Sequence, residues 1–125
     1  MKNILLFFSL FLSAAIAVVN TYAIERFWYW EYPWVDLPMH FAGGVLIGAL
    51  SLWVAGRLGR TLRAGGLFWI ALAVGVAWEI FEYAVGAVAV SRDSYSLDTL
   101  IDLAMDVCGA FLPLLLSRFF YGRRS

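Results

Sequence analysis

The chain has 125 residues, of which 63% are hydrophobic and only 14% are charged, and its mean hydropathy is +0.82. This composition excludes an ordinary soluble domain and predicts a small all-α protein that crosses a membrane several times. The formal net charge is zero, and we expect the lipid bilayer, not a nucleic acid, to be the partner.

Four apolar runs predict four transmembrane helices, because a spanning helix needs about 20 apolar residues. The runs cover approximately residues 4–23, 37–55, 67–90 and 97–120. Their short connections leave no room for an extramembrane enzyme domain. We therefore expect one integral membrane domain over residues 1–125, folded as a four-helix bundle.

Basic residues predict the orientation of this bundle. Two of the nine, Arg26 and Arg92, fall on one side of the predicted spans. The other seven fall on the opposite side: Lys2, Arg57, Arg60, Arg63, Arg118, Arg123 and Arg124. Cytoplasmic loops carry the excess of Lys and Arg, so both termini are predicted to be cytoplasmic, in a multi-pass protein of the inner or plasma membrane.

The first apolar run has two interpretations. A signal peptide is one, since Thr21-Tyr22-Ala23 resembles a cleavage site. A retained helix is the one we favour, because small and polar residues recur on one helical face, as in a helix packed within a bundle. These residues are Ser9, Ser13, Ala17 and Asn20.

An aromatic segment follows, from Phe27 to Trp34. Tryptophan and tyrosine gather where a membrane meets water, so the segment predicts an interfacial belt in the first outer loop. A stacking platform for a lipid headgroup or a sugar is the functional alternative.

The second run opens with Asp36 and His40, which are one helical turn apart and share a face. Gly44 and Gly48 extend that face and predict a close contact between two helix backbones. Asp36 is either a helix N-cap or a site residue. His40 is either a hydrogen-bonding residue between helices or a ligand or proton carrier that the neighbouring acid orients.

The third run repeats this pattern of small and acidic residues. Its face carries Gly75, Glu79, Glu82 and Gly86. A charged side chain near the bilayer centre costs roughly 2.5–3.5 kcal/mol on insertion scales. Glu79 and Glu82 must therefore face the protein interior and find partners there.

The fourth run places Asp98, Asp102 and Asp106 at successive i, i+4 positions. A favourable interaction with the helix N-terminus explains Asp98, but it does not reach Asp106. The single cysteine, Cys108, cannot form an intramolecular disulfide, and we predict that it is a buried packing residue beside Gly109.

A rise of about 1.5 Å per residue places these groups in the outer half of the membrane, with His40 about 6 Å deep, Asp106 about 14 Å and Glu79 about 16 Å. Burial and mutual repulsion prevent this number of carboxylates from all remaining ionised there. We therefore expect that some are protonated or that a divalent cation binds. The predicted catalytic residues are Glu79, Glu82 and Asp102. The predicted metal ligands are Asp36, His40, Glu79, Glu82, Asp98, Asp102 and Asp106.

These motifs also carry a family resemblance. They stand in the order Asp36-x-x-x-His40-Phe41, Glu79-x-x-Glu82 and Asp102-x-x-x-Asp106-x-x-Gly109. The series resembles the VanZ-like membrane family, and the fuller forms Trp78-Glu79-x-Phe81-Glu82-Tyr83 and Asp98-Thr99-x-x-Asp102-Leu103 resemble the YjdF-type inner-membrane proteins. The chain is the more acidic version, with Leu37, Glu82 and Asp106 where the VanZ-like pattern has Lys, Gln and Asn. The resemblance implies a helical membrane protein, an association with glycopeptide-antibiotic resistance and no established reaction.

Several functions fit this sequence. A metal-dependent enzyme would act at the outer leaflet on a lipid-linked or other envelope substrate. A cation or proton carrier would use the same acids and would need a homo-oligomer, since four helices are few for a transporter. A noncatalytic envelope factor would use the polar stripe for packing alone. The sequence contains no HExxH motif and no nucleophile beside a base, so it leaves these alternatives open.

Overall fold

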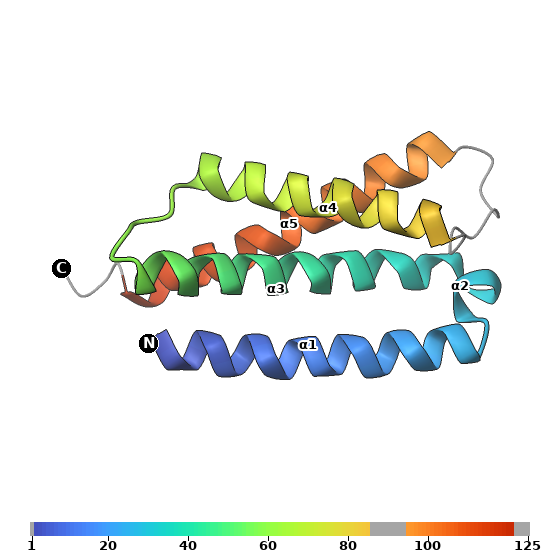
Figure 1. The fold of residues 1–125 in the computed structure, drawn as a ribbon, viewed down its shortest axis with the longest axis horizontal. Coiled ribbons are helices and arrows are strands. Elements are labelled where there is room, and N and C mark those ends of the chain that lie inside the picture. The colour runs from blue at the N-terminus through green and yellow to red at the C-terminus, as the bar shows by residue number, and fades with distance from the viewer. Residues whose placement is uncertain (1, 86–94, 122–125) are drawn as a thin grey trace.

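The computed structural model describes residues 2–85 and 95–121, which fold into helices and connecting turns with no strand among them (Figure 1). The elements are α1 (Lys2–Glu25), α2 (Trp28–Glu31), the 3₁₀ turn η1 (Pro33–Val35), α3 (Asp36–Arg57), α4 (Ala64–Val85) and α5 (Tyr95–Tyr121). Four of the helices, α1, α3, α4 and α5, are long and apolar enough to cross a membrane. The predicted all-α bundle with four spans is confirmed. Gly86–Val90 of the predicted third span and Arg92 lie outside the described residues.

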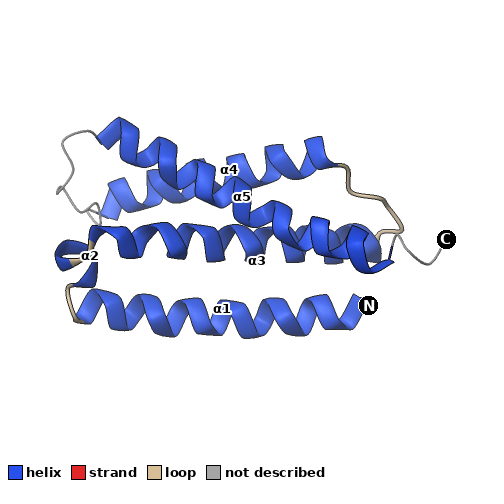
Figure 2. Ribbon diagram, turned by 180° about the vertical axis from the view of Figure 1, so that it is seen from behind, coloured by secondary structure: helices blue, strands red, loops and turns tan. Residues whose placement is uncertain are grey.

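Helix α3 is the centre of the bundle. It packs against α5 along most of its length, against α1 on another side, and against α4, which also packs on α5. Both ribbon views show α1 running beside α3, on the side away from α4 and α5 (Figure 2). Helix α1 begins and α5 ends at the same end of the bundle.

Glycine residues bring the backbones of α3 and α5 into contact. A Cβ atom added to Gly44 would overlap the main-chain carbonyl of Asp106, and one added to Gly48 would overlap that of Ala110. Helix α5 contributes Gly109, where a Cβ would meet the backbone of α3. The close contact predicted from Gly44 and Gly48 is confirmed, and it fixes the register of α5 against α3.

The two ends of the bundle differ in the residues that they bury. The basic end, where α3 ends and α4 begins, contains an apolar core of Leu67, Ala71, Ala110 and Leu114. Among the described residues, the acidic end, where α3 and α5 begin, buries four polar side chains. These are His40, Glu79, Asp102 and Asp106.

The aromatic segment is more ordered than a loop. Helix α1 continues to Glu25, and Phe27 then adopts a left-handed conformation with φ 57°, which is uncommon outside glycine and reverses the chain into α2. Phe27, Trp30 and Trp34 are exposed, as an interfacial belt requires. Tyr29 instead faces the bundle, where it bonds to α1.

The prediction for Cys108 is wrong. Its side chain is exposed on α5, because the close contact with α3 uses Gly109 and Ala110, which lie on a different face of the helix. In a membrane-spanning helix an outward-facing cysteine contacts lipid, as apolar residues do on the same surface.

Candidate functional site

His40 is the centre of the polar cluster at the acidic end. Its imidazole is buried on α3 and 5% exposed. The Nδ1 atom lies 3.3 Å from both carboxylate oxygens of Asp106 on α5. The Nε2 atom lies 3.7 Å from Asp36 Oδ1 and 3.7 Å from Glu79 Oε1. One imidazole therefore joins carboxylates from three helices.

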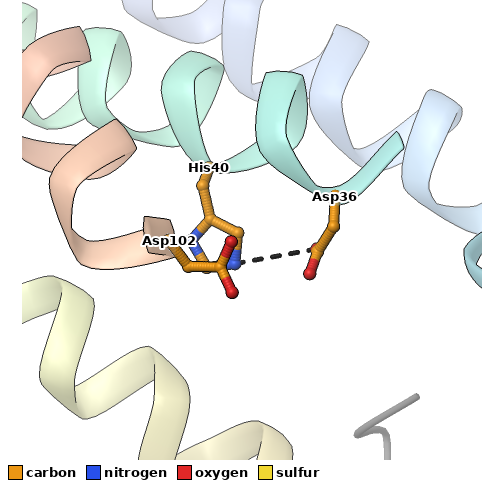
Figure 3. Close-up of side chains that lie close together, drawn as sticks. All are labelled: Asp36, His40 and Asp102. Atoms are coloured by element: carbon orange, nitrogen blue, oxygen red, sulfur yellow. Dashed lines mark ion pairs between the residues drawn. The ribbon is translucent and has the colours of Figure 1, made fainter. Parts of the chain in front are cut away.

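Asp36 lies one turn before His40 and points toward it, as the spacing predicts. Figure 3 shows this ion pair, with Asp102 approaching the same imidazole from α5. The N-cap residue of α3 is Val35, which makes no side-chain capping hydrogen bond. The N-cap interpretation of Asp36 is therefore wrong, because Asp36 is the first residue of α3 and has helical dihedral angles of φ −62° and ψ −42°.

Glu79 uses its two carboxylate oxygens differently. Oε2 accepts a hydrogen bond of 2.9 Å from the Thr99 hydroxyl of α5. Oε1 is buried and has no hydrogen-bond partner in the described part of the chain, although it faces His40. Because a buried carboxylate oxygen without such a partner is costly, this atom indicates a place for a cation or a proton.

Two sequence features position these groups, one predicted and one missed. Gly75 of the predicted stripe makes room for the acid on α5, since a Cβ there would lie 2.6 Å from Asp106 Oδ2. Thr99 was missed as a site residue. Its spacing of three and seven residues before Asp102 and Asp106 places it on their face, which is the signal that identifies it.

The predicted metal ligands form two overlapping groups. Asp36, His40 and Asp102 make one, and His40, Glu79 and Glu82 make the other, each with ligand atoms within 4.8 Å of one another. Asp106 contacts the opposite ring nitrogen of His40. Asp98, in the first turn of α5, belongs to neither group. Six of the seven predicted ligands are thus brought together.

Glu82 and Tyr29 surround the outer edge of this cluster. Glu82 is half-buried and accepts a 2.8 Å hydrogen bond from the indole Nε1 of Trp78. The Tyr29 hydroxyl donates a 2.6 Å bond to Asn20 Oδ1 of α1. Burial, and then the negative charges of Asp36 and Glu82, raise the pKa of Tyr29 to about 12.

This shift predicts an alkaline transition. The phenol pKa is above its ordinary value of 10.0, so the unfolded chain loses this proton first as the pH rises. Stability from Tyr29 is therefore complete below pH 10 and is lost as the pH rises toward 12. Alkaline melting curves of the wild type and Tyr29→Phe test this. Equal losses of stability in the two proteins over that interval would contradict the shift.

A cavity of about 420 Å³ adjoins His40 between α1, α3 and α4. Asp36, Glu82 and Asp106 also form part of its wall, together with Tyr29. Its volume lies in the range of small-molecule sites, about 300–1,000 Å³. The cavity could not be predicted from the sequence, because it depends on the separation of α1 from α4.

A family model for predicted membrane proteins, DUF2238, matches residues 1–123. The chain belongs to the DUF2238 family. No curated protein and no solved structure matches it. Membership in DUF2238 agrees with the four spans and names no reaction, so the chemistry of this family member has to come from its site.

The donor atoms of this DUF2238 protein fit a divalent cation. If Nδ1 of His40 carries the proton and donates it to Asp106, the lone pair of Nε2 is directed toward Asp36 and Glu79. In many metal sites a carboxylate orients the metal-binding histidine in this way. Ligand bonds of 2.0–2.1 Å in a tetrahedral site separate ligand atoms by about 3.3 Å. The Nε2 atom lies 3.7 Å from one oxygen of Asp36 and 3.7 Å from one oxygen of Glu79, a few tenths of an ångström more than this value.

Proposed function

We propose that this protein binds a divalent cation at His40 and acts on a lipid-linked or other envelope substrate at the outer half of the membrane. The observation that carries the proposal is the buried Oε1 of Glu79, which faces His40 Nε2 and has no hydrogen-bond partner among the described residues. A cation there offsets both the desolvation of this oxygen and its repulsion from Asp36.

The roles follow from burial and position. His40 and Glu79 are buried and supply the central ligands of one group, and Asp36 and Asp102 are the alternative ligands that form the other group with His40. Asp106 orients the imidazole through its contact with Nδ1. A bound divalent cation supplies a Lewis acid that activates water. Glu82, on the cavity wall within the second group, is placed to accept the proton.

The structure favours a site that is accessible from one face of the membrane over a carrier. Alternating access requires that a bound ion reach both faces of the membrane. Beyond Asp106, the buried cluster of the basic end is apolar, with Leu67, Ala71, Ala110 and Leu114. The other buried polar side chain in the described residues, Ser9, bonds to the Leu5 carbonyl of its own helix. A homo-oligomer, which the carrier alternative needs, is not required by the enzyme proposal.

The resemblance to VanZ-like and YjdF-type proteins supports an envelope role. A noncatalytic packing function is the competing proposal, because His40 already pairs with Asp36, Glu79 and Asp106. Elemental analysis separates them. We expect protein purified from membranes without chelator to contain a stoichiometric divalent metal, and His40→Ala protein to contain none. If the wild-type protein is purified without metal and binds no added Zn²⁺, Mn²⁺ or Mg²⁺, the metal proposal is wrong and the packing function remains.

Asp36→Ser gives a finer test of the ligand set. Asp36 contacts His40 and does not cap α3, so the change should leave the melting temperature of metal-free protein nearly unchanged. Loss of a group that binds or orients a ligand typically costs about 10–100-fold in metal affinity, and we expect a loss of that size in a metal titration. Unchanged affinity would remove Asp36 from the site.

Orientation determines which membrane face the site serves. We propose that the basic end is cytoplasmic, in the inner or plasma membrane, because Arg57, Arg60, Arg63 and Arg118 lie there. Reporters fused to each terminus should both be active in the cytoplasm. An external C-terminus would contradict this orientation and move the site to the other membrane face, whereas a mature N-terminus at Ile24 would contradict the arrangement of four spans.

A further inference from the structure

The cavity changes character along its length in the same direction on α3 and α4. On α3 the wall passes from Asp36 and His40 to Leu46 and Ile47. On α4 it passes from Glu82 to Val74 toward the basic end. The ten residues from Asp36 to Leu46 span about 15 Å. The cavity is therefore polar near the acidic end and apolar deeper in the bundle, the distribution of an amphiphile.

The cavity also has a side that faces lipid. Helices α1 and α4 both line it, yet both pack chiefly on α3 or α5 and not on one another. Ile16 and Ala17 of α1 and Val74 of α4 thus form opposite walls above the floor of α3. Because α1 and α4 pack chiefly on α3 and α5, an opening between them would let an apolar chain enter laterally from the bilayer.

The polar end is suited to a cation. Asp36 and Glu82 belong to different helices, and both are half-buried on the wall of the cavity. The negative charges of both raise the pKa of the Tyr29 phenol. Tyr29 and Trp78 add aromatic rings beside these acids, and aromatic faces together with carboxylates recognise ammonium groups. No Lys or Arg is among the described residues that line the cavity. The buried, unbonded Oε1 of Glu79 lies behind this wall at His40.

We propose that the cavity binds a lipid with an ammonium headgroup, with one apolar chain between α1 and α4 and the headgroup at Asp36 and Glu82. The inference rests on the proposed function, because it names the class of substrate that the same site would hold. No basic side chain lines the cavity to balance a phosphate against the carboxylates of Asp36 and Glu82, so a phosphate would depend on the proposed cation alone. An ammonium group gains from both acids and from the rings of Tyr29 and Trp78.

Photolabelling tests this proposal on the full chain in phosphatidylcholine nanodiscs. The probes are three alkyl chains of equal length that carry the same diazirine and end in an amine, an alcohol or a phosphate. We expect the amine to label peptides that contain Ile16, Ile47 or Val74 at least tenfold more than the alcohol does. Unlabelled alkylamine should compete for this labelling.

Two variants and a matched control locate the site. Val74→Phe fills the apolar half of the cavity and should abolish labelling by all three probes. Val76→Phe makes the same change on the outer surface of α4, where Val76 is exposed and does not line the cavity, and should preserve labelling. Glu82→Gln should lower amine labelling about tenfold and leave alcohol labelling unchanged.

The outcomes separate this inference from the metal proposal, because metal content is measured on the same samples. Equal labelling by amine and alcohol, or undiminished labelling in Val74→Phe, would overturn the lipid site even if the metal is present. Labelling by the phosphate alone, and only in metal-loaded protein, would also overturn the ammonium assignment. Amine labelling with the expected variant pattern supports the inference whether or not a metal is found.

Discussion

Chelation is expected to lower the melting temperature of the wild-type protein in detergent at neutral pH by several degrees. A ligand that binds only the folded state stabilises it by about 2.7 kcal/mol when its concentration is a hundred times its dissociation constant. Removing the ion also restores the repulsion between Asp36 and Glu79, which share the Nε2 side of His40. A thermal unfolding series with and without chelator measures the effect.

Glu79→Gln is the matched control. The amide keeps the shape of the side chain, and its oxygen can still accept the hydrogen bond from Thr99. Its NH₂ group can take the position of the buried Oε1 and donate to His40 Nε2. We therefore expect the variant to lose the chelator response and to be nearly as stable as metal-free wild type.

Asp106→Asn extends this control to the other side of the imidazole. It should also abolish the response, because the amide orients His40 less strongly than a carboxylate does. If the wild type melts identically with and without chelator, and both amide variants are strongly destabilised, then the acids are hydrogen-bonded packing groups. The metal proposal would be wrong.

Gly48→Ala is expected to destabilise the bundle by about 1–3 kcal/mol or more, the cost of overpacking a fitted interior. A Cβ at Gly48 would overlap the backbone carbonyl of Ala110, and a backbone cannot move aside as a flexible side chain can. Helices α3 and α5 must therefore separate. Thermal unfolding of the metal-free variant measures the loss without a contribution from the ion.

Gly65→Ala is the control on the same scaffold. A Cβ at Gly65 in α4 would meet nothing within 4 Å, so only the helix propensity changes, which favours Ala by up to about 1 kcal/mol. We expect this variant to be equal to or slightly more stable than the wild type. If Gly48→Ala behaved like Gly65→Ala, the close contact between α3 and α5 would not contribute to stability.

The periodicity of the sequence predicted the membership of the polar cluster but not its geometry. Acids at helical spacing on three apolar runs had to face inward, and Asp36, Glu79 and Asp106 do meet at His40. The depth calculation separated His40 from Asp106 by about 8 Å, yet their side chains lie 3.3 Å apart. That calculation treated the helices as parallel with known ends.

The missing information was the register between helices. The contacts of Gly44, Gly48 and Gly109 set how far α5 slides along α3, and a sequence of one chain does not specify which glycines meet. For the same reason Asp98 could not be separated from the acids that join the cluster. The contribution of Tyr29 depended on a chain reversal at Phe27 that favours glycine and was not predicted.

The backbone contact between α3 and α5 has a consequence for how the proposed site would adapt to a cation. His40 and Asp106 belong to helices that cannot slide past one another without opening the contact at Gly44. The positions of these two side chains relative to one another are therefore fixed. Glu79 and Glu82 belong to α4, which packs less extensively on α3 than α5 does. Under the metal proposal, the position of α4 would follow the size of the ion, and the contact of Gly75 with the Asp106 carboxylate sets the closest approach of α4 to α5.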